Sequence, residues 1–369
     1  MEGPERSVLK RLKVMVKCIR IKHSFPKANE KQDISTMSDQ QNQNSSLNGD
    51  SQGRNSVEIV LESFTAIIIF LASILTNCIV LYVIRTNPTL KTFTNKIIAN
   101  LCLVDMAETL LIMPLWVTSL IKGQWIFGNI ICNVSGFLFF AMANATLYSL
   151  LLIALSRYFK VVKPQLYNGI FFAKKSRPKI LLALCWIAPL IICSPPLYGW
   201  GKYKFYPQSF LCTFEWSFDG LHVSYLVFLA ITQPSPYIIC WCYFKIYNTV
   251  RRNRIQICTR ANRAACKNAH NAENMCIHTT LGIACVVVLC WLPKAILVLL
   301  LGGGKKGLSL PLMISSYLVF LACCLNPIVY GMMNPQFKPA FKALFIKRGM
   351  RNPDLAAFST YSIPTIHSK

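Results

Sequence analysis

Charged residues are scarce in this chain of 369 residues. They make up 14% of the sequence, whereas a typical soluble domain carries about 25%. Acidic residues are the rarest, with 14 Asp and Glu against 39 Lys and Arg. So few charges cannot cover a water-exposed surface, and 54% of the residues are hydrophobic. The composition therefore excludes a soluble globular protein and indicates a protein of the membrane.

Seven long apolar segments occupy nearly everything after residue 57. A helix presents about 20 apolar residues to cross the hydrocarbon core, because its backbone polar groups must be satisfied internally. We expect an all-α membrane protein, a seven-transmembrane helix bundle, with no room for a soluble catalytic domain and hence no enzyme activity. The expected spans are residues 59–85, 95–120, 130–160, 179–199, 221–250, 275–301 and 309–332.

Four regions follow from these spans. Residues 1–57 are expected to form an extracellular, largely disordered segment, and residues 58–333 the transmembrane domain. Residues 334–348 alternate Phe and Leu with Lys and Arg, a pattern that predicts a short amphipathic helix on the inner leaflet after the seventh span. Residues 349–369 are expected to form a cytoplasmic tail.

Lys and Arg are distributed unevenly around the spans. The three inner loops and the tail hold 23 of them, and the three outer loops hold six. Short basic loops remain cytoplasmic, so we expect a multi-pass plasma-membrane protein with its N-terminus outside and its C-terminus inside. The net charge of +25 thus reflects topology and suits an anionic inner leaflet, and nucleic acid is not an expected partner.

The N-terminal segment conflicts with this rule, because residues 1–36 hold nine Lys and Arg that would have to be translocated. They show no secretory signal pattern. Our hypothesis is that synthesis starts at Met37, or that residues 1–36 are a wrongly predicted extension. Detection of peptides from residues 1–30 at the cell surface would contradict it. Asn44 is the expected glycosylation site, in Asn44-Ser45-Ser46.

Most of the 16 cysteines lie within the spans, where Cys acts as a small apolar residue. Cys132 and Cys212 are the pair on the outer side of the expected bundle. An oxidising compartment favours a disulfide between them, which would hold the second outer loop across the mouth of the bundle. The alternative is two unpaired thiols.

Motifs in six of the seven spans follow the order typical of one receptor family. They are Asn77, Asn100-Leu101-Cys102-Leu103-Val104-Asp105, Ser156-Arg157-Tyr158, Trp186, Cys290-Trp291-Leu292-Pro293 and Asn326-Pro327-Ile328-Val329-Tyr330. On these residues the chain resembles a rhodopsin-like (class A) G-protein-coupled receptor over residues 59–348. The resemblance implies activation of a heterotrimeric G protein by an extracellular ligand, with arrestin and a receptor kinase as further partners.

The resemblance also implies a polar site in the middle of the membrane. A carboxylate there is costly and marks a functional site by default, so Asp105 is the first candidate. Its expected partners are Asn77, Thr146 and Asn326, which could share a sodium ion or a water cluster with it. The alternative is a protonated, structurally hydrogen-bonded acid. The family's further polar residue in helix seven is Ala322 here, which places sodium affinity in question.

An activation switch is implied at the inner half of the bundle. Arg157 is expected to pair with Glu273 in the resting state, and outward movement of helix six would break the pair. The alternative for Arg157 is a simple inner-leaflet anchor. The switch would further include Trp291, Tyr243, Asn326, Pro327 and Tyr330, with Pro293 and Pro327 bending their helices. The alternative for each tyrosine is core packing.

The expected ligand pocket is apolar and aromatic, and its members are Phe139, Phe140, Ala143, Trp291, Lys294, Tyr317 and Phe320. Phe139 stands where amine receptors carry an aspartate, and Phe320 stands where opsins carry the retinal lysine. An amine ligand is therefore disfavoured, and covalent retinal through helix seven is excluded. For Lys294 we favour snorkelling to the membrane interface. The alternative is an ion pair with an acidic ligand group.

The second outer loop, with Gly199-Trp200-Gly201 and Cys212-Thr213-Phe214-Glu215-Trp216, looks like that of opsins and melatonin receptors. We expect a receptor for a small, mostly apolar ligand. One alternative is an opsin-like receptor without covalent retinal. The other is a constitutive or non-signalling receptor, because three residues depart from the family pattern: Ser156, Val287 and Gln165. A microbial-type pump is disfavoured because it would need a lysine in helix seven for retinal, and this sequence has none there. A transporter is disfavoured because it would show internal repeats, and none is visible in the sequence.

Overall fold

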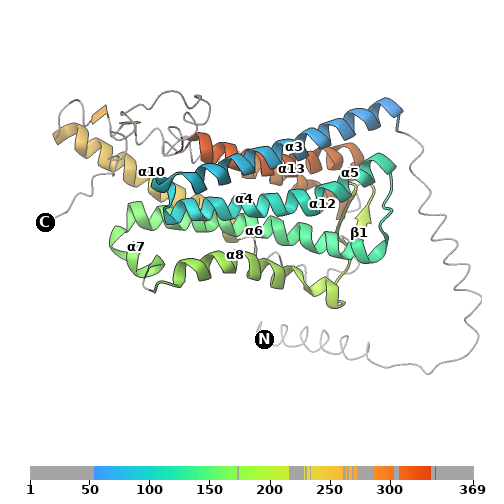
Figure 1. Cartoon of the computed structure of the whole chain (residues 1–369), viewed down its shortest axis with the longest axis horizontal. Coiled ribbons are helices and arrows are strands. Elements are labelled where there is room, and N and C mark those ends of the chain that lie inside the picture. The colour runs from blue at the N-terminus through green and yellow to red at the C-terminus, as the bar shows by residue number, and fades with distance from the viewer. Residues whose placement is uncertain are drawn as a thin grey trace, which may run out of the picture. The chain divides into compact units, whose positions relative to one another are not determined.

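The computed structural model describes residues 54–172, 174–215, 234–260, 286–302 and 307–333, together with the isolated residues 228, 231–232, 263, 266–267, 270–271, 282 and 337. The long helices lie side by side in one bundle (Figure 1). They are α3 (Ser56–Thr86), α4 (Phe93–Leu111), α5 (Met113–Lys122), α6 (Gly128–Val162), α8 (Arg177–Cys193), α10 (Pro234–Arg260), α12 (Leu292–Gly302) and α13 (Ser309–Met333). Shorter elements are η1 (Pro88–Leu90), α7 (Pro164–Phe171), η2 (Pro195–Tyr198) and the π-helical η4 (Val287–Trp291).

These helices account for the seven predicted spans, and the predicted fold class is confirmed. Five stretches of the described residues are long and apolar enough to cross a membrane: residues 56–86, 93–122, 128–162, 177–198 and 309–329. The second span is interrupted at Ile112, because Pro114 has no backbone N–H to continue the helix. The fifth span corresponds to α10, which continues to Arg260, ten residues beyond the predicted end. The sixth corresponds to η4 and α12.

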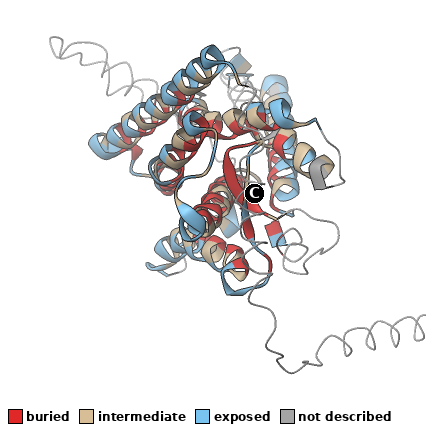
Figure 2. Cartoon of the chain, turned by 90° about the vertical axis from the view of Figure 1, so that its right-hand side faces the viewer, coloured by how far each residue is buried: buried red, intermediate tan, exposed pale blue. Residues whose placement is uncertain are grey.

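The bundle buries its interior and exposes apolar residues on its outside. Viewed along the bundle, buried positions face inward and exposed positions face outward (Figure 2). Phe64, Leu71 and Leu75 of α3 are each about 60% exposed although they are apolar. A helix that is apolar on every side suits a membrane span, since its outer side contacts lipid instead of water. Helix α6 lies at the centre and packs against α4, α8 and α10.

A small hairpin lies against α6 near one end of the bundle. Strands β1 (Tyr203–Tyr206) and β2 (Leu211–Phe214) pair antiparallel, with Tyr203 opposite Phe214. The Tyr203 hydroxyl donates to the Cys193 carbonyl at 2.7 Å, and burial raises the pKa of this phenol above its usual value. The Tyr203 ring also lies against Gly136 of α6, so the hairpin is fitted to a side-chain-free position on that helix.

Gly136→Ala should therefore destabilise the protein. A Cβ on residue 136 would lie 2.7 Å from the Tyr203 ring, so the hairpin or the ring must shift. Overpacking of this kind costs about 1–3 kcal/mol. The matched control is Gly169→Ala in α7, where a Cβ meets nothing within 4 Å and the change should be neutral or slightly stabilising. Thermal unfolding of the purified variants compares the two; equal melting temperatures would contradict the close fit.

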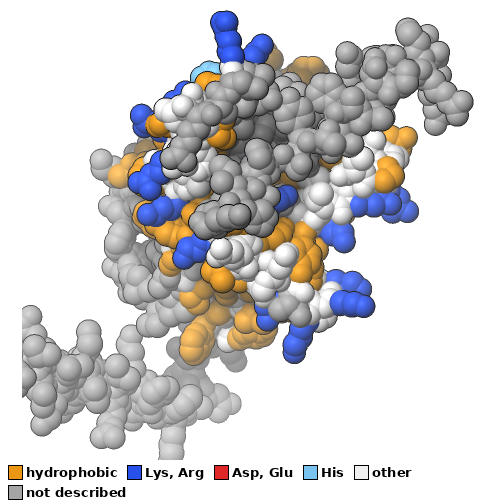
Figure 3. Space-filling model, turned by 90° about the vertical axis from the view of Figure 1, so that its left-hand side faces the viewer, with side chains coloured by type: hydrophobic (Ala, Val, Ile, Leu, Met, Phe, Trp, Pro, Cys, Tyr) orange, Lys and Arg blue, Asp and Glu red, His pale blue; other side chains and the backbone are white. Residues whose placement is uncertain are grey.

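The opposite end of the bundle is strongly basic. Lys and Arg side chains surround its described surface, and no Asp or Glu is visible on the described part of that face (Figure 3). The exposed members include Arg85, Lys91, Lys160, Lys163, Lys174, Lys175, Arg251 and Arg252. The two ends of the bundle therefore differ in charge as well as in structure.

Several predicted features lie outside the described residues. They are the N-terminal segment with Asn44, the switch residue Glu273, the tail after residue 348, and the helix 334–348 apart from Phe337. Phe337 itself is fully buried in the main hydrophobic core. The region boundaries and the glycosylation site stay predictions.

Candidate functional site

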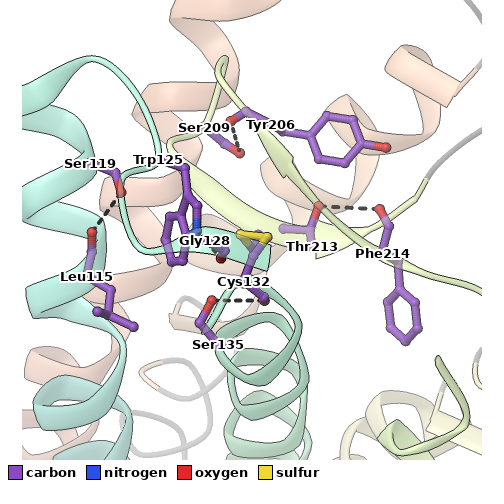
Figure 4. Close-up of a disulfide and its surroundings, with 11 residues drawn as sticks. Leu115, Ser119, Trp125, Gly128, Cys132, Ser135, Tyr206, Ser209, Thr213 and Phe214 are labelled. Atoms are coloured by element: carbon purple, nitrogen blue, oxygen red, sulfur yellow. Dashed lines mark hydrogen bonds between the residues drawn. A yellow bond between two sulfur atoms is a disulfide. The ribbon is translucent and has the colours of Figure 1, made fainter. Parts of the chain in front are cut away.

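A disulfide joins the hairpin to the N-terminal end of α6. Cys132 of α6 and Cys212 of β2 are bonded across a separation of 80 residues (Figure 4). Close by, Trp125 Nε1 donates to the Gly128 carbonyl at 2.8 Å and closes the turn that enters α6. The predicted bridge is confirmed, and it fixes the loop that carries the hairpin to the bundle.

A second disulfide was not predicted. It joins Cys258, near the end of α10, to Cys266, eight residues later. Both residues follow the basic stretch of α10, on the side that the charge rule assigns to the cytoplasm. Cytosolic disulfides are uncommon, so sequence reasoning gave no cause to pair these two thiols.

The predicted polar site is present in the centre of the bundle. Asp105 of α4 is 1% exposed, and its carboxylate accepts hydrogen bonds from two other helices. Thr146 Oγ1 of α6 donates at 3.1 Å, and Asn326 Nδ2 of α13 donates at 3.1 Å. The carboxylate thus connects three helices at one point, and its partner Asn326 directly precedes Pro327 within α13.

Asn77 has a different set of partners from the one expected. Its amide donates to the backbone carbonyls of Ser73 and Cys323, at 2.9 and 3.0 Å. Within the described residues, its Oδ1 is buried without a hydrogen-bond partner. Asn77 therefore joins α3 to α13 through the Cys323 carbonyl instead of bonding Asp105, and its Oδ1 is a buried acceptor.

Five of the seven predicted pocket residues belong to one cluster in the half of the bundle that carries the hairpin. Phe139, Phe140, Trp291, Tyr317 and Phe320 share this cluster with Trp116 of α5. The Trp116 ring centroid lies 4.9 Å from that of Tyr317 and 4.6 Å from that of Phe320. Ala143 is half-buried on α6 and is not a member of this cluster. The role of the cluster in ligand binding stays a prediction.

Lys294 does not snorkel, and that preferred interpretation is wrong. The side chain is 8% exposed and points into the bundle, where Nζ donates to Ser316 Oγ of α13 at 2.9 Å. The physical reason is local: Lys294 follows Trp291 by three residues, so both side chains lie on the inward face of the helix. The ammonium therefore lies beside the aromatic cluster.

The predicted switch residues are only partly described. Arg157 is half-buried near the C-terminal end of α6, and the neighbouring Ser156 hydroxyl lies 3.2 Å from the Thr94 hydroxyl of α4. Tyr243 is 4% exposed within the core. Helix α13 runs through Pro327, and the five residues before Leu292 form a π-helical segment. The pairing of Arg157 with Glu273 and the role of Tyr330 stay predictions.

Comparison with known proteins agrees with this arrangement. The sequence profile described as "7 transmembrane receptor (rhodopsin family)" matches residues 76–330, more than half of the chain. The chain belongs to this receptor family. The structure of squid rhodopsin shares the fold of this receptor, with a TM-score of 0.65 and 22% identity over 85% of this chain and 95% of that one.

The relatives of this rhodopsin-family receptor include several kinds of receptor. G-protein coupled receptor 161 of Xenopus tropicalis is 24% identical, over 84% of this chain and 66% of that protein. The human protein of the same name is 24% identical over 75% of this chain and 57% of its own length. Green-sensitive opsin-1 of Psalidodon fasciatus is 28% identical, over 78% of this chain and 81% of that protein. The chain thus spans about two thirds or less of the first two.

Two residues of this receptor's site were missed by sequence reasoning. Glu108 lies one helical turn from Asp105, is 1% exposed, and has a buried Oε1 without a hydrogen-bond partner among the described residues. Its other contact is with Cys323 of α13. The sequence signal that could have revealed Glu108 was a second acid within a membrane span, three residues after Asp105. Trp116 is fully buried within the aromatic cluster, and its only signal was its position after Pro114.

Proposed function

We propose that this receptor binds a small, mostly apolar extracellular ligand and activates a heterotrimeric G protein. The observation that carries the proposal is the junction at Asp105, where one carboxylate joins α4, α6 and α13. An aromatic cluster lies in the outer half of the bundle, and a basic surface lies at the opposite end. A junction shared by three helices can couple a change in packing around the ligand to a change at the inner end. We assign the protein no catalytic role.

The two ends of the bundle support an orientation in the plasma membrane. The basic end suits the cytoplasm, and the end with the Cys132–Cys212 disulfide suits the oxidising exterior. The N-terminus would then lie outside and the C-terminus inside. The names of the relatives state coupling to G proteins. Arrestin and a receptor kinase are further proposed partners at the inner end.

The test is a second-messenger screen of surface-expressing cells against a library of small molecules. A ligand that raises the signal in the wild type should raise none with Arg157→Ala at matched surface expression, because this arginine is the proposed contact for the G protein. A signal that survives Arg157→Ala would contradict G-protein activation through the inner end.

We further propose that the Asp105 site holds a sodium ion. The site offers a carboxylate, and the buried oxygens of Asn77 and Glu108 have no hydrogen-bond partner among the described residues. Oxygen atoms of this kind suit a hard cation. Sodium chloride should raise the melting temperature of the purified receptor above that in choline chloride, and Asp105→Asn should abolish the difference. If sodium chloride still raises the melting temperature of Asp105→Asn by the same amount, the ion binds at another site.

An opsin-like receptor without covalent retinal is the second candidate, supported by the opsins among the relatives. Phe320 occupies the position of the retinal lysine and packs against Trp116, so helix seven offers no amine at that site. Retinal would have to bind without a covalent link there. Binding of retinal that persists after borohydride and denaturation would contradict this exclusion.

A further inference from the structure

Lys294 is a buried cation with an incomplete set of partners. Lysine is almost never fully buried unless it is paired, yet this side chain is 8% exposed. Its Nζ can donate three hydrogen bonds, and within the described part of the chain it donates one, to Ser316 Oγ. A neutral hydroxyl cannot balance the charge, so the ammonium lacks a counter-ion there.

Four acids of the described part have other partners. Glu215 lies 3.9 Å from Lys204 on the hairpin, and Glu58 caps the first turn of α3. Asp105 accepts from Thr146 and Asn326 in the middle of the membrane, and Glu108 contacts Cys323 of α13. The counter-charge therefore has to come from outside this set.

The position of the ammonium suits a bound ligand. The Ser316 hydroxyl is directed at the carbonyls of Leu312 and Ser209, at 3.0 and 3.5 Å. Ser209 lies in the turn of the hairpin, and its carbonyl also accepts from Trp116 Nε1 at 3.2 Å. Lys294 is thus connected through Ser316 to the turn of the hairpin and to the aromatic cluster.

An unbalanced buried charge costs stability, and such costs persist at sites where function needs them. We propose that Lys294 recognises the anionic end of the ligand, and that the ligand is a small amphipathic carboxylic acid. Its carboxylate would pair with Lys294, and its apolar body would contact the cluster around Trp116. One lysine matches one negative charge, whereas a phosphate monoester carries nearly two. The inference rests on the proposed function, because it names the ligand class of that receptor.

The experiment uses the purified full-length receptor in lipid nanodiscs, without a G protein. The probes are decanoic acid and 4-phenylbutanoic acid, each compared with its methyl ester, and the readouts are melting temperature and affinity. Both acids should stabilise the wild type more than their esters do. Lys294→Met should weaken acid binding about 10- to 100-fold, the loss expected for a hydrogen bond to a charged group. It should leave ester binding unchanged.

Two matched variants test whether the preference for acid over ester depends on the charge of residue 294 and on its position. Lys294→Arg keeps the charge and should keep the preference for acid over ester. Lys204→Met removes a lysine from the exposed hairpin, where the side chain is 65% exposed, and should leave that preference intact. A preference that survives Lys294→Met, or that is lost with Lys204→Met, would overturn the proposal.

The ligand-free protein gives an independent measurement. Lys294→Met removes the unbalanced ammonium and should hold or raise the melting temperature. A fall in melting temperature, with no acid protecting the wild type better than its ester, would make Lys294 a structural residue and overturn the proposal. Failure of the receptor to signal would not affect these binding data. A neutral ligand that signals equally through the wild type and Lys294→Met would overturn the ligand class and leave the proposed function standing.

Discussion

Cys132→Ser and Cys212→Ser should each remove most of the receptor from the cell surface. The bond closes a loop of 80 residues and holds the hairpin over α6. Removing a native disulfide costs about 2–5 kcal/mol, a large part of the stability of a folded protein. Surface labelling and the melting temperature of the purified protein measure the loss.

The double variant should be no worse than either single variant, because one bond is lost in all three. The matched control is Cys78→Ser on α3, where the thiol is exposed and unbonded, and it should change little. Additive losses from Cys132→Ser and Cys212→Ser would show that the two thiols act separately.

Glu273→Ala should raise signalling in the absence of ligand. If Glu273 holds Arg157 in the resting state, removing the carboxylate releases helix six. Ser156 takes the place of the acid that the family resemblance implies there, and its hydroxyl contacts that of Thr94 on α4, so Arg157 has no carboxylate from that neighbour. Coupling energies of about 1–3 kcal/mol would raise basal activity roughly 5- to 150-fold from a low starting population. Basal second-messenger output, normalised to surface expression, measures the change.

Ser156→Asp is the opposing variant, since it returns a carboxylate to Arg157 and should lower basal output. Arg157→Ala should abolish signalling altogether. If Glu273→Ala leaves basal output unchanged while Arg157→Ala abolishes signalling, the arginine serves only to contact the G protein and the resting pair does not exist.

The spans and the central polar site could be predicted because each follows from the membrane. A helix that crosses lipid must be long and apolar, so composition alone places the seven segments. A carboxylate in such a segment needs partners, and Thr146 and Asn326 are indeed bonded to Asp105. The disulfide could be predicted because the charge rule assigns Cys132 and Cys212 to the expected outer, oxidising side.

The partners of individual side chains could not be predicted. Lys294 lies three residues after Trp291 and shares its inward face, but the sequence carries no signal that Ser316 of α13 accepts from the ammonium. Glu108 lies within the same span as Asp105, but its orientation toward Cys323 depends on how α4 packs against α13. Asn77 fits the family pattern, yet its bonds depend on backbone carbonyls that have no sequence signal.

Helix α10 also has a mechanical consequence. Its last ten residues, Arg251–Arg260, continue past the predicted end of the span and are rich in Arg. At about 1.5 Å per residue, this extension is a rigid rod of roughly 15 Å. A tilt of about 10° at the membrane surface would move its tip by about 2.6 Å over that length. The extension therefore acts as a lever that enlarges small rotations of the bundle, and the Cys258–Cys266 bond places a covalent loop at its tip.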